Sequence, residues 1–330
     1  MKPSALDIFV CPRCHSSLDL RNSKGSDGEI MDGVLVCRAC SASYPITRGV
    51  PRFVGTGSYA SSFGRQWQWF RTVQIDSLNG DSTSRETLRG ATGWSEADVR
   101  GKLVLDAGGG AGRFAECIAD QGGRVVAVDL TEAIDAAYAN IGRRPDVHLA
   151  QADIFALPFR ERTFDLAYSM GVLHHTPDPA AAFACVARTV KPAGQMAVYL
   201  YARYGAGHRM PDLIRSCTTR LPAPLMFVLS TAAIPLYFVY RVPGLGRVLK
   251  FVLPISMLPN WRWRWLDTFD WYTPKYQFKF LYPEVFRWFR ANGFRDVEIF
   301  DGPIRMRGEK ARPEPSHGTD ATRELVAAVH

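Results

Sequence analysis

Acidic residues are almost absent from one long stretch of this 330-residue sequence. Between residues 203 and 266 there is a single acid, Asp212, against nine arginines and lysines. Residues 1–200 hold 21 charges of each sign, so the formal net charge of +8 arises in the later stretch. A basic surface of this kind attracts anionic partners such as phospholipid headgroups, phosphorylated substrates or nucleic acid.

The sequence also lacks a secretory signal and internal repeats. The first residues contain no apolar core of the length that signal peptides carry, which favours the cytoplasm. Three of the seven cysteines, Cys117, Cys185 and Cys217, stand singly, and isolated cysteines in cytosolic proteins are usually small core residues. We therefore expect folded domains, followed by a polar and flexible tail over residues 308–330.

The other four cysteines form two C-x-x-C pairs, Cys11 with Cys14 and Cys37 with Cys40, separated by 22 residues. Each pair offers two thiolates from one tight turn, and four thiolates complete the tetrahedral shell of Zn²⁺. A closed shell leaves no open position for catalysis, so the pattern predicts a structural zinc site. The alternatives are two disulfides or a redox pair; the missing secretory signal and the matched second pair weigh against them.

The second cysteine pair begins a segment that carries a family resemblance. It reads Cys37-Arg-Ala-Cys40-Ser-Ala-Ser-Tyr-Pro-Ile-Thr-Arg-Gly-Val-Pro-Arg-Phe53. It resembles the zinc-ribbon family of small activator subunits that partner tRNA and protein methyltransferases, and similar ribbons also occur fused ahead of bacterial methyltransferases. The resemblance covers about the first 55 residues and implies a zinc ribbon there, without by itself implying an RNA substrate.

A glycine-rich loop follows a short apolar run that begins at Leu103 and ends in an acid. It reads Asp106-x-Gly108-x-Gly110-x-Gly112. Glycines let the backbone turn sharply and approach a ligand closely, but such a loop also fits dinucleotide binding. Asp106 favours S-adenosylmethionine, because a carboxylate can face the cationic amino-acid end that a nicotinamide dinucleotide lacks.

Further acids follow at the ends of successive strand patterns. Asp129 ends the second strand, 23 residues after Asp106, where a carboxylate can bind ribose hydroxyls. Asp153 follows the third strand, where it can accept a hydrogen bond from an adenine amino group. Residues 163–177 fit strand four and its exit loop, and residues 190–199 fit a turn and strand five. Each acid alone is an ordinary cap or loop carboxylate, so the cofactor hypothesis depends on the series.

In this order the residues resemble the class I S-adenosylmethionine-dependent methyltransferases, in the branch containing quinone, sterol and other small-molecule enzymes. The resemblance runs from about residue 100 to 200; Ala193 departs from it where the family often has a glycine. It implies a doubly wound, Rossmann-like α/β sheet, mostly parallel with an antiparallel last strand, and S-adenosyl-L-methionine as cofactor. The cofactor-binding residues it implies are Asp106, Gly108, Gly110 and Gly112 at the methionine part, Asp129 and Leu130 at the ribose, Asp153 and Ile154 at the adenine, and Ser169 and Met170 near the sulfonium.

The methyl-transfer step needs few catalytic groups. Direct displacement at a sulfonium requires alignment and a dry site, with a general base only for a hydroxyl or protonated amine acceptor. His174 and His175 follow strand four at the carboxyl edge of the sheet and are the candidate bases, His174 slightly ahead. Alternatively they only hold the loop before Pro177. Trp67, in an aromatic segment ahead of the core, is a candidate for the substrate side, or part of a packing helix.

Residues 203–283 form an insertion that should select the substrate. Residues 221–240 contain no charge, and 20 residues suffice to cross a bilayer, but three prolines there argue against a regular span. Apolar runs interleaved with basic residues over 221–259 suit peripheral contact with a membrane interface, a cap over a lipophilic substrate, or plain core packing. Asp270, Tyr272 and Tyr276 are candidates for lining the acceptor pocket.

The sequence therefore predicts a methyltransferase that modifies an oxygen or nitrogen atom of a small-molecule acceptor, lipophilic or linked to lipid or phosphate. We expect it in the cytoplasm or peripheral on the inner membrane face. The alternatives are an RNA (tRNA) methyltransferase, kept open by the ribbon and the basic stretch, and a non-catalytic cofactor-binding or regulatory module. The predicted segments are a zinc ribbon (1–55), a helical linker or lid (56–100), the cofactor-binding core (101–202), the insertion (203–283), a closing helix with the last two strands (284–307) and the tail (308–330).

Overall fold

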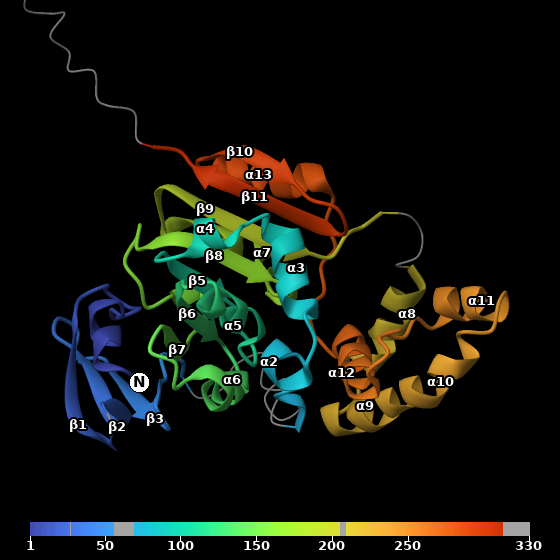
Figure 1. The fold of residues 1–330 in the computed structure, drawn as a ribbon, viewed down its shortest axis with the longest axis horizontal. Coiled ribbons are helices and arrows are strands. Elements are labelled where there is room, and N and C mark those ends of the chain that lie inside the picture. The colour runs from blue at the N-terminus through green and yellow to red at the C-terminus, as the bar shows by residue number, and fades with distance from the viewer. Residues whose placement is uncertain (27, 56–68, 205–208, 313–330) are drawn as a thin grey trace, which may run out of the picture.

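A seven-stranded sheet forms the centre of the computed structural model, which describes residues 1–26, 28–55, 69–204 and 209–312. The strand order is β10-β11-β9-β8-β5-β6-β7, and β11 runs in the opposite direction to the other six strands (Figure 1). The predicted Rossmann-like fold with an antiparallel last strand is thereby confirmed. The strands are β5 (Leu103–Ala107), β6 (Arg124–Asp129), β7 (Val147–Gln151), β8 (Phe164–Met170), β9 (Val190–Leu200), β10 (Phe294–Ile299) and β11 (Ile304–Lys310).

Helices cover both faces of this sheet, which explains why a strand such as β5 is buried along its whole length. On one face, α3 (Thr83–Thr92), α5 (Arg113–Asp120) and α6 (Ala133–Ile141) pack through small and aliphatic side chains. On the other, α7 (Pro179–Arg188) and α13 (Tyr282–Ala291) pack through Phe183 and Phe289, whose ring centroids lie 4.9 Å apart. The shorter helices are α2 (Asp76–Asn79), α4 (Glu96–Val99), η3 (Ile154–Ala156) and η4 (Leu173–His175).

The N-terminal unit is a four-stranded antiparallel sheet preceded by η1 (Pro3–Asp7). It docks on the β7 side of the core through Phe9, whose ring lies 5.4 Å from Phe53 and 5.8 Å from Phe159. Backbone hydrogen bonds across the junction, such as Phe53 N–H to the Gln151 carbonyl at 2.8 Å, extend the contact. The ribbon is therefore fixed to the core. Its strands are β1 (Leu18–Ser26), β2 (Glu29–Cys37), β3 (Ser43–Thr47) and β4 (Val50–Pro51).

The insertion forms a helical lobe at the end of the molecule opposite the ribbon, which we call the arm (residues 209–272; Figure 1). The uncharged run at 221–240 is broken into short pieces, and no helix in the described ranges is long and apolar enough to cross a membrane. The aromatic stretch after Asn260 is helical as far as Tyr272, with the Asn260 side chain accepting hydrogen bonds at the helix start. The arm helices are α8 (Arg209–Thr218), α9 (Ala223–Leu229), η5 (Ser230–Ala232), α10 (Ala233–Val239), α11 (Leu245–Val252) and α12 (Trp261–Tyr272).

The last strand is longer than the sequence suggested. β11 continues to Lys310, so the tail boundary predicted at residue 308 is wrong by three residues. Gly308 pairs with Met196 of β9, and a Cβ at this position would lie 2.7 Å from the Phe289 ring. The glycine that suggested the start of a flexible tail is instead required for close packing of the strand against α13.

Candidate active site

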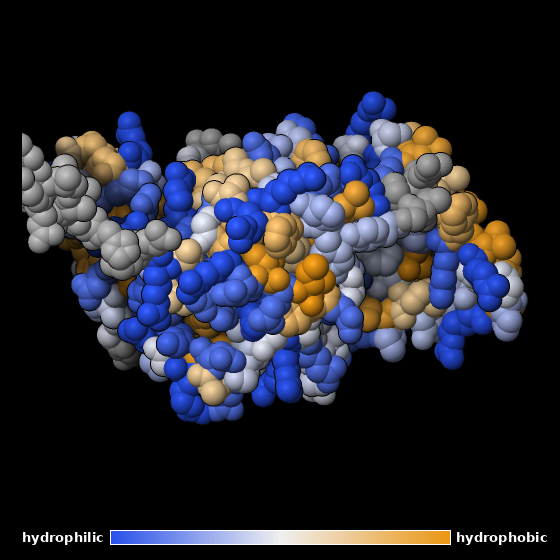
Figure 2. All heavy atoms as spheres, turned by 90° about the horizontal axis from the view of Figure 1, so that it is seen from above, coloured by the Kyte–Doolittle hydropathy of each residue, from blue (hydrophilic) through white to orange (hydrophobic). Residues whose placement is uncertain are grey.

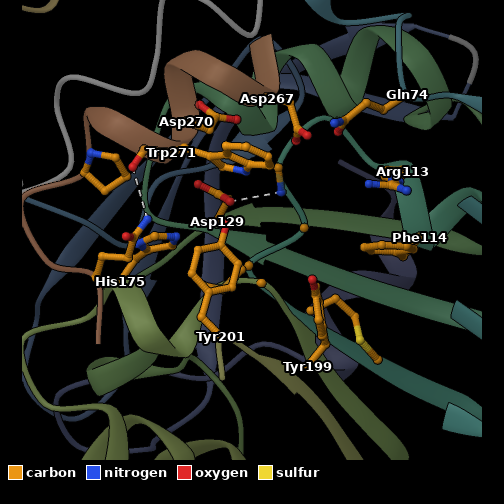
Figure 3. Close-up of a pocket in the computed structure, with 18 of the residues that line it drawn as sticks. Gln74, Arg113, Phe114, Asp129, His175, Tyr199, Tyr201, Asp267, Asp270 and Trp271 are labelled. Atoms are coloured by element: carbon orange, nitrogen blue, oxygen red, sulfur yellow. Dashed lines mark hydrogen bonds between the residues drawn. The ribbon is translucent and has the colours of Figure 1, made fainter. Parts of the chain in front are cut away.

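A cavity of about 780 Å³ lies where β5, β6, β8 and β9 end, in the size range of ligand pockets. One wall is formed by the glycine loop and the ends of these strands, and the opposite wall by α12 and the residues that flank it (Figure 3). In doubly wound folds, ligands bind at this edge of the sheet. The cavity therefore brings the sequence-predicted cofactor loop together with the predicted acceptor segment.

The glycine loop has a backbone that side chains would not permit. Gly108 adopts a φ of +98°, and a Cβ there would lie 2.4 Å from a Val172 methyl group. The Gly110 N–H donates to Asp129 Oδ2 at 2.9 Å, which ties the loop to the end of β6. Gly108 and Gly110 line the cavity, so bare backbone faces the space where a cofactor would lie.

Asp129 lines the cavity, and its carboxylate already accepts several hydrogen bonds from the protein. Oδ1 accepts from Thr131 N–H at 2.8 Å and from the Thr131 hydroxyl at 2.7 Å, and burial raises the pKa of the carboxyl group. Oδ2 accepts only the Gly110 N–H among the hydrogen bonds of the described residues, so it retains a lone pair for a ligand hydroxyl. The donor set fits a ribose, and Leu130, Ile154 and Met170 provide neighbouring wall.

Five of the predicted site residues are not among those that line the cavity. Asp106 is only 1% exposed beneath the loop, and burial, reinforced by the Asp129 charge, raises its pKa to about 7. Ser169 donates its hydroxyl to the Ala107 carbonyl at 2.7 Å, and Asp153 caps η3 by accepting from Phe155 N–H at 3.0 Å. These residues shape the wall, and direct contact with a cofactor stays a prediction for them. The five are Asp106, Gly112, Asp153, Ser169 and His174.

The two histidines differ in position although they are adjacent in sequence. His174 is fully buried, with its ring centroid 4.0 Å from that of Tyr201, and burial holds its pKa well below the usual value. His175 lines the cavity and donates Nδ1–H to the Tyr276 carbonyl at 2.8 Å, since a carbonyl can only accept. Burial lowers the pKa of His175 to about 4, so the ring is neutral at physiological pH with Nε2 unprotonated. His175 is therefore better placed than His174 to reach a ligand.

The acceptor side of the cavity combines carboxylates with aromatic rings. Asp267 and Asp270 project from α12, and Figure 3 shows them above Tyr199 and Tyr201 from the end of β9. Burial raises the pKa of Asp267, while a Ser256 hydrogen bond and the Arg113 charge oppose the shift. Tyr272 and Tyr276, predicted for this side, also line the cavity. Trp67 lies outside the described residues.

Several wall residues were not predicted from the sequence. Tyr199 and Tyr201 flank the buried Leu200, so their alternation at a strand end was a usable signal for two side chains on one face. Arg113 follows the glycine loop directly, with its guanidinium carbon 4.6 Å from the centroid of the Phe114 ring. Gln74, Asp267 and Arg305 carry no local sequence signal, because distant segments bring them to the cavity.

The four paired cysteines meet at one end of the ribbon. Their sulfur atoms all lie within 4.8 Å of one another, with Cys14 Sγ 3.4 Å from Cys37 Sγ and Cys11 Sγ 3.6 Å from Cys40 Sγ. These separations are too long for disulfides and fit the edges of a tetrahedral thiolate site. The Tyr44 hydroxyl, 3.2 Å from Cys11 Sγ, adds an outer-shell contact. The residues thus fit a structural zinc ion.

Comparison with known proteins agrees with both units. A family model described as a methyltransferase domain matches residues 105–198, and one described as a Trm112p-like protein matches residues 2–49. A ubiquinone biosynthesis O-methyltransferase of Aromatoleum aromaticum is 37% identical over 132 residues, 36% of this chain and 56% of that protein. A demethylmenaquinone methyltransferase of Renibacterium salmoninarum is 35% identical over 100 residues, 30% of this chain and 41% of that protein. The chain spans about half the length of the curated relatives it matches.

Among solved structures, human N-acetylserotonin methyltransferase in complex with SAM is 19% identical, with a TM-score of 0.45. The match covers 77% of this chain and 58% of that chain. The two family matches coincide with the units that the cysteine pairs and the glycine loop delimit. The chain thus carries a region that matches a methyltransferase domain, behind an N-terminal unit that matches a Trm112p-like protein and brings four cysteines together.

Proposed function

We propose that this protein transfers the methyl group of S-adenosylmethionine to an oxygen or nitrogen atom of a small lipophilic acceptor, with a ring hydroxyl of a quinol-type molecule as the leading case. The observation that carries the proposal is the single cavity shared by the glycine loop and α12. A cofactor on the loop side and an acceptor on the α12 side would meet inside it. The relatives' names refer to ubiquinone and demethylmenaquinone, which supports this acceptor class over RNA.

The cofactor, when bound, supplies a methyl group on a positively charged sulfur. In the proposed arrangement, Asp129 Oδ2 holds a ribose hydroxyl, and the backbone of Gly108 and Gly110 lies against the methionine part. In the same arrangement, Ile154 would cover the adenine and Met170 would lie toward the sulfonium, since both line the cavity. Burial raises the pKa of Asp106 to about 7, and a cation bound on the other side of the loop backbone would favour the charged form of this carboxyl group.

For a hydroxyl acceptor, the new bond joins the acceptor oxygen to the methyl carbon while the carbon–sulfur bond breaks. The hydroxyl proton must leave with a base. His175 lines the cavity and its Nε2 is unprotonated, so we assign this nitrogen the role of proton acceptor. A ring with its pKa lowered to about 4 is a weak base, so we expect it to assist the displacement rather than to ionise the acceptor beforehand.

The α12 side of the cavity suits an acceptor that is apolar with a few polar groups. Pro254, Leu258, Trp263 and Trp271 give apolar wall, while Asp267 offers a carboxylate to a hydroxyl or amine proton. Such an acceptor is held in a membrane, and peripheral contact of residues 221–259 with the membrane surface would give the protein access to it.

A transfer assay tests the proposal. The zinc-loaded protein is incubated with S-adenosylmethionine labelled in its methyl group and, separately, a detergent-dispersed polyprenyl catechol, a short-chain catechol and tRNA. We expect label in the organic phase with the catechols, reduced at least tenfold by Asp129→Ala and unchanged by Glu161→Ala, an exposed acid that precedes β8 at the opposite edge of the sheet and does not line the cavity. Label on tRNA alone, or no transfer to any catechol or amine acceptor by protein that binds the cofactor, would contradict the proposed acceptor class.

A further inference from the structure

The end of the arm farthest from the sheet exposes an unusual number of large apolar side chains. Phe238 is 67% exposed, Val248 59% and Phe251 54%, and all three belong to helices α10 and α11. Figure 2 shows hydrophobic side chains gathered at the arm end of the molecule, with hydrophilic side chains beside them. We call this surface the arm tip; it consists of Phe238, Val239, Val242, Leu245, Val248, Phe251, Val252 and Leu253.

The arm tip is a built surface rather than a poorly packed core. A small cluster of Ala233, Tyr240 and Ile255, with Leu249 against it, joins α10 to α11 from the inside. The Tyr240 hydroxyl donates to the Leu253 carbonyl at 2.5 Å and closes the turn. The inward side of α11 is thus already packed through Leu249, yet residues 245, 248 and 252 expose apolar side chains to solvent. A surface helix normally carries polar residues there, so the apolar side of α11 extends beyond its internal contact into solvent.

The charge around the arm tip has one sign. The sequence holds no acid from residue 213 to residue 266, and Arg241, Arg247 and Lys250 are all exposed at the tip. Within the described part of the chain, none of these three forms an ion pair; the Arg241 guanidinium lies 5.5 Å from the Tyr237 ring centroid. An apolar surface ringed by unpaired cations complements a layer of apolar chains beneath anionic headgroups.

We infer that the arm tip docks on the surface of an anionic phospholipid bilayer, with its apolar side chains in the headgroup region and Arg241, Arg247 and Lys250 against lipid phosphates. Pairing with the same surface of a second copy would bring these cations together without an acid to offset them, which disfavours self-association. Nucleic acid would meet the cations but leave the aliphatic side chains in water.

The docked orientation connects the bilayer to the cavity. Leu253 belongs to the arm tip, while the next residue, Pro254, and then Leu258 line the cavity. A lipophilic molecule leaving the bilayer at the tip would therefore follow apolar side chains to the α12 side. This delivery role rests on the proposed function, whereas the docking surface itself does not.

Vesicle flotation of the full chain tests the docking. Wild type is mixed with phosphatidylcholine vesicles, with or without about one-third phosphatidylglycerol, at low and high salt. We expect flotation with the anionic vesicles only, weakened by salt, and reduced about tenfold or more by Arg247→Glu/Lys250→Glu and by Val248→Glu/Phe251→Glu. Matched controls should float like wild type: Arg287→Glu/Arg290→Glu has the same helical spacing on α13, and Ile299→Glu replaces a side chain that is 57% exposed on β10.

Titration of S-adenosylmethionine into each variant separates this inference from the proposed function, because none of the changed residues lines the cavity. Normal cofactor binding with no flotation by wild type would overturn the docking and leave the methyl transfer standing. Flotation unaffected by either arm-tip variant would also overturn it. The docking would also be overturned if wild type formed a dimer that Val248→Glu/Phe251→Glu converts to a monomer, and if wild type did not bind vesicles. The arm tip would then be covered by a second copy of the chain.

Discussion

Replacement of Gly108 by alanine tests the backbone of the glycine loop. At a φ of +98° an alanine is strained by about 1–2 kcal/mol. Its Cβ would also lie 2.4–2.8 Å from three side-chain carbons of Val172, and overpacking of that kind costs about 1–3 kcal/mol. We expect Gly108→Ala to lower the free energy of unfolding by about 2–5 kcal/mol, the sum of the two terms, and to abolish measurable cofactor binding.

Two further variants separate these contributions in urea unfolding experiments. Gly80→Ala has a φ of +72° with nothing within 4 Å of the new Cβ, so it should show the strain alone. In Gly108→Ala/Val172→Ala the Val172 methyl groups that crowd the new Cβ are gone. The loss in free energy of unfolding should therefore be about 1–3 kcal/mol smaller than the sum of the losses in the two single variants. A Gly108→Ala protein as stable as Gly80→Ala, or additive effects in the double variant, would refute the packing described for the loop.

Three more predictions concern the ribbon and the site. Chelation of zinc, or Cys40→Ala, should unfold the ribbon and lower the melting temperature, followed by circular dichroism and by zinc release. Arg52→Ala should cost about 2 kcal/mol or more, because Arg52 pairs with Asp135 at 2.6 Å with both side chains 11% exposed. Arg48→Ala removes a pair with the same Asp135 from a side chain that is 71% exposed, and should cost less than about 1 kcal/mol. The pKa of His175 is lowered to about 4 in the folded protein, so the folded state keeps this ring neutral at a pH where the unfolded chain already binds a proton. The free energy of unfolding should therefore be highest above pH 6.5 and should fall as the pH decreases toward 4. His175→Asn should remove about 3 kcal/mol of this decrease, as measured by unfolding titrations across that pH range.

The ribbon account is contradicted if the melting temperature does not respond to chelation, or if Arg48→Ala costs as much as Arg52→Ala. The histidine account is contradicted if wild type and His175→Asn lose stability in parallel between pH 6.5 and 4. Burial lowers the pKa of His148 to about 4 as well, but that residue is common to both proteins and cancels in the difference.

The sheet and the ribbon could be predicted because their signals are local. The C-x-x-C pairs, the glycine loop and the acids that end strands each report a turn or a strand end within a few residues. Asp129 lies on the cavity wall, and its contact with a ribose stays a prediction. The length of β11 was underestimated because Gly308 has a packing role that depends on Phe289, a residue distant from the turn signal.

The division between His174 and His175 could not be predicted from the sequence. Both follow the same strand, and a short 3₁₀ turn directs one ring against Tyr201 and the other toward the cavity. Similarly, the composition of residues 221–259 was compatible with an interface, a cap or a core. The structure distinguishes two parts of this segment: the outward residues of α11 are exposed, whereas Pro254 and Leu258 line the cavity.

Isothermal titration of S-adenosylmethionine into the zinc-loaded protein tests the central claim most directly, with Asp129→Ala as the variant and Glu161→Ala as the control. The account predicts saturable binding that Asp129→Ala weakens at least tenfold, about 1.4 kcal/mol, and that Glu161→Ala leaves unchanged. Absence of binding to folded wild-type protein, or equal binding by wild type and Asp129→Ala, would contradict the assignment of the cavity as a methyl-donor site.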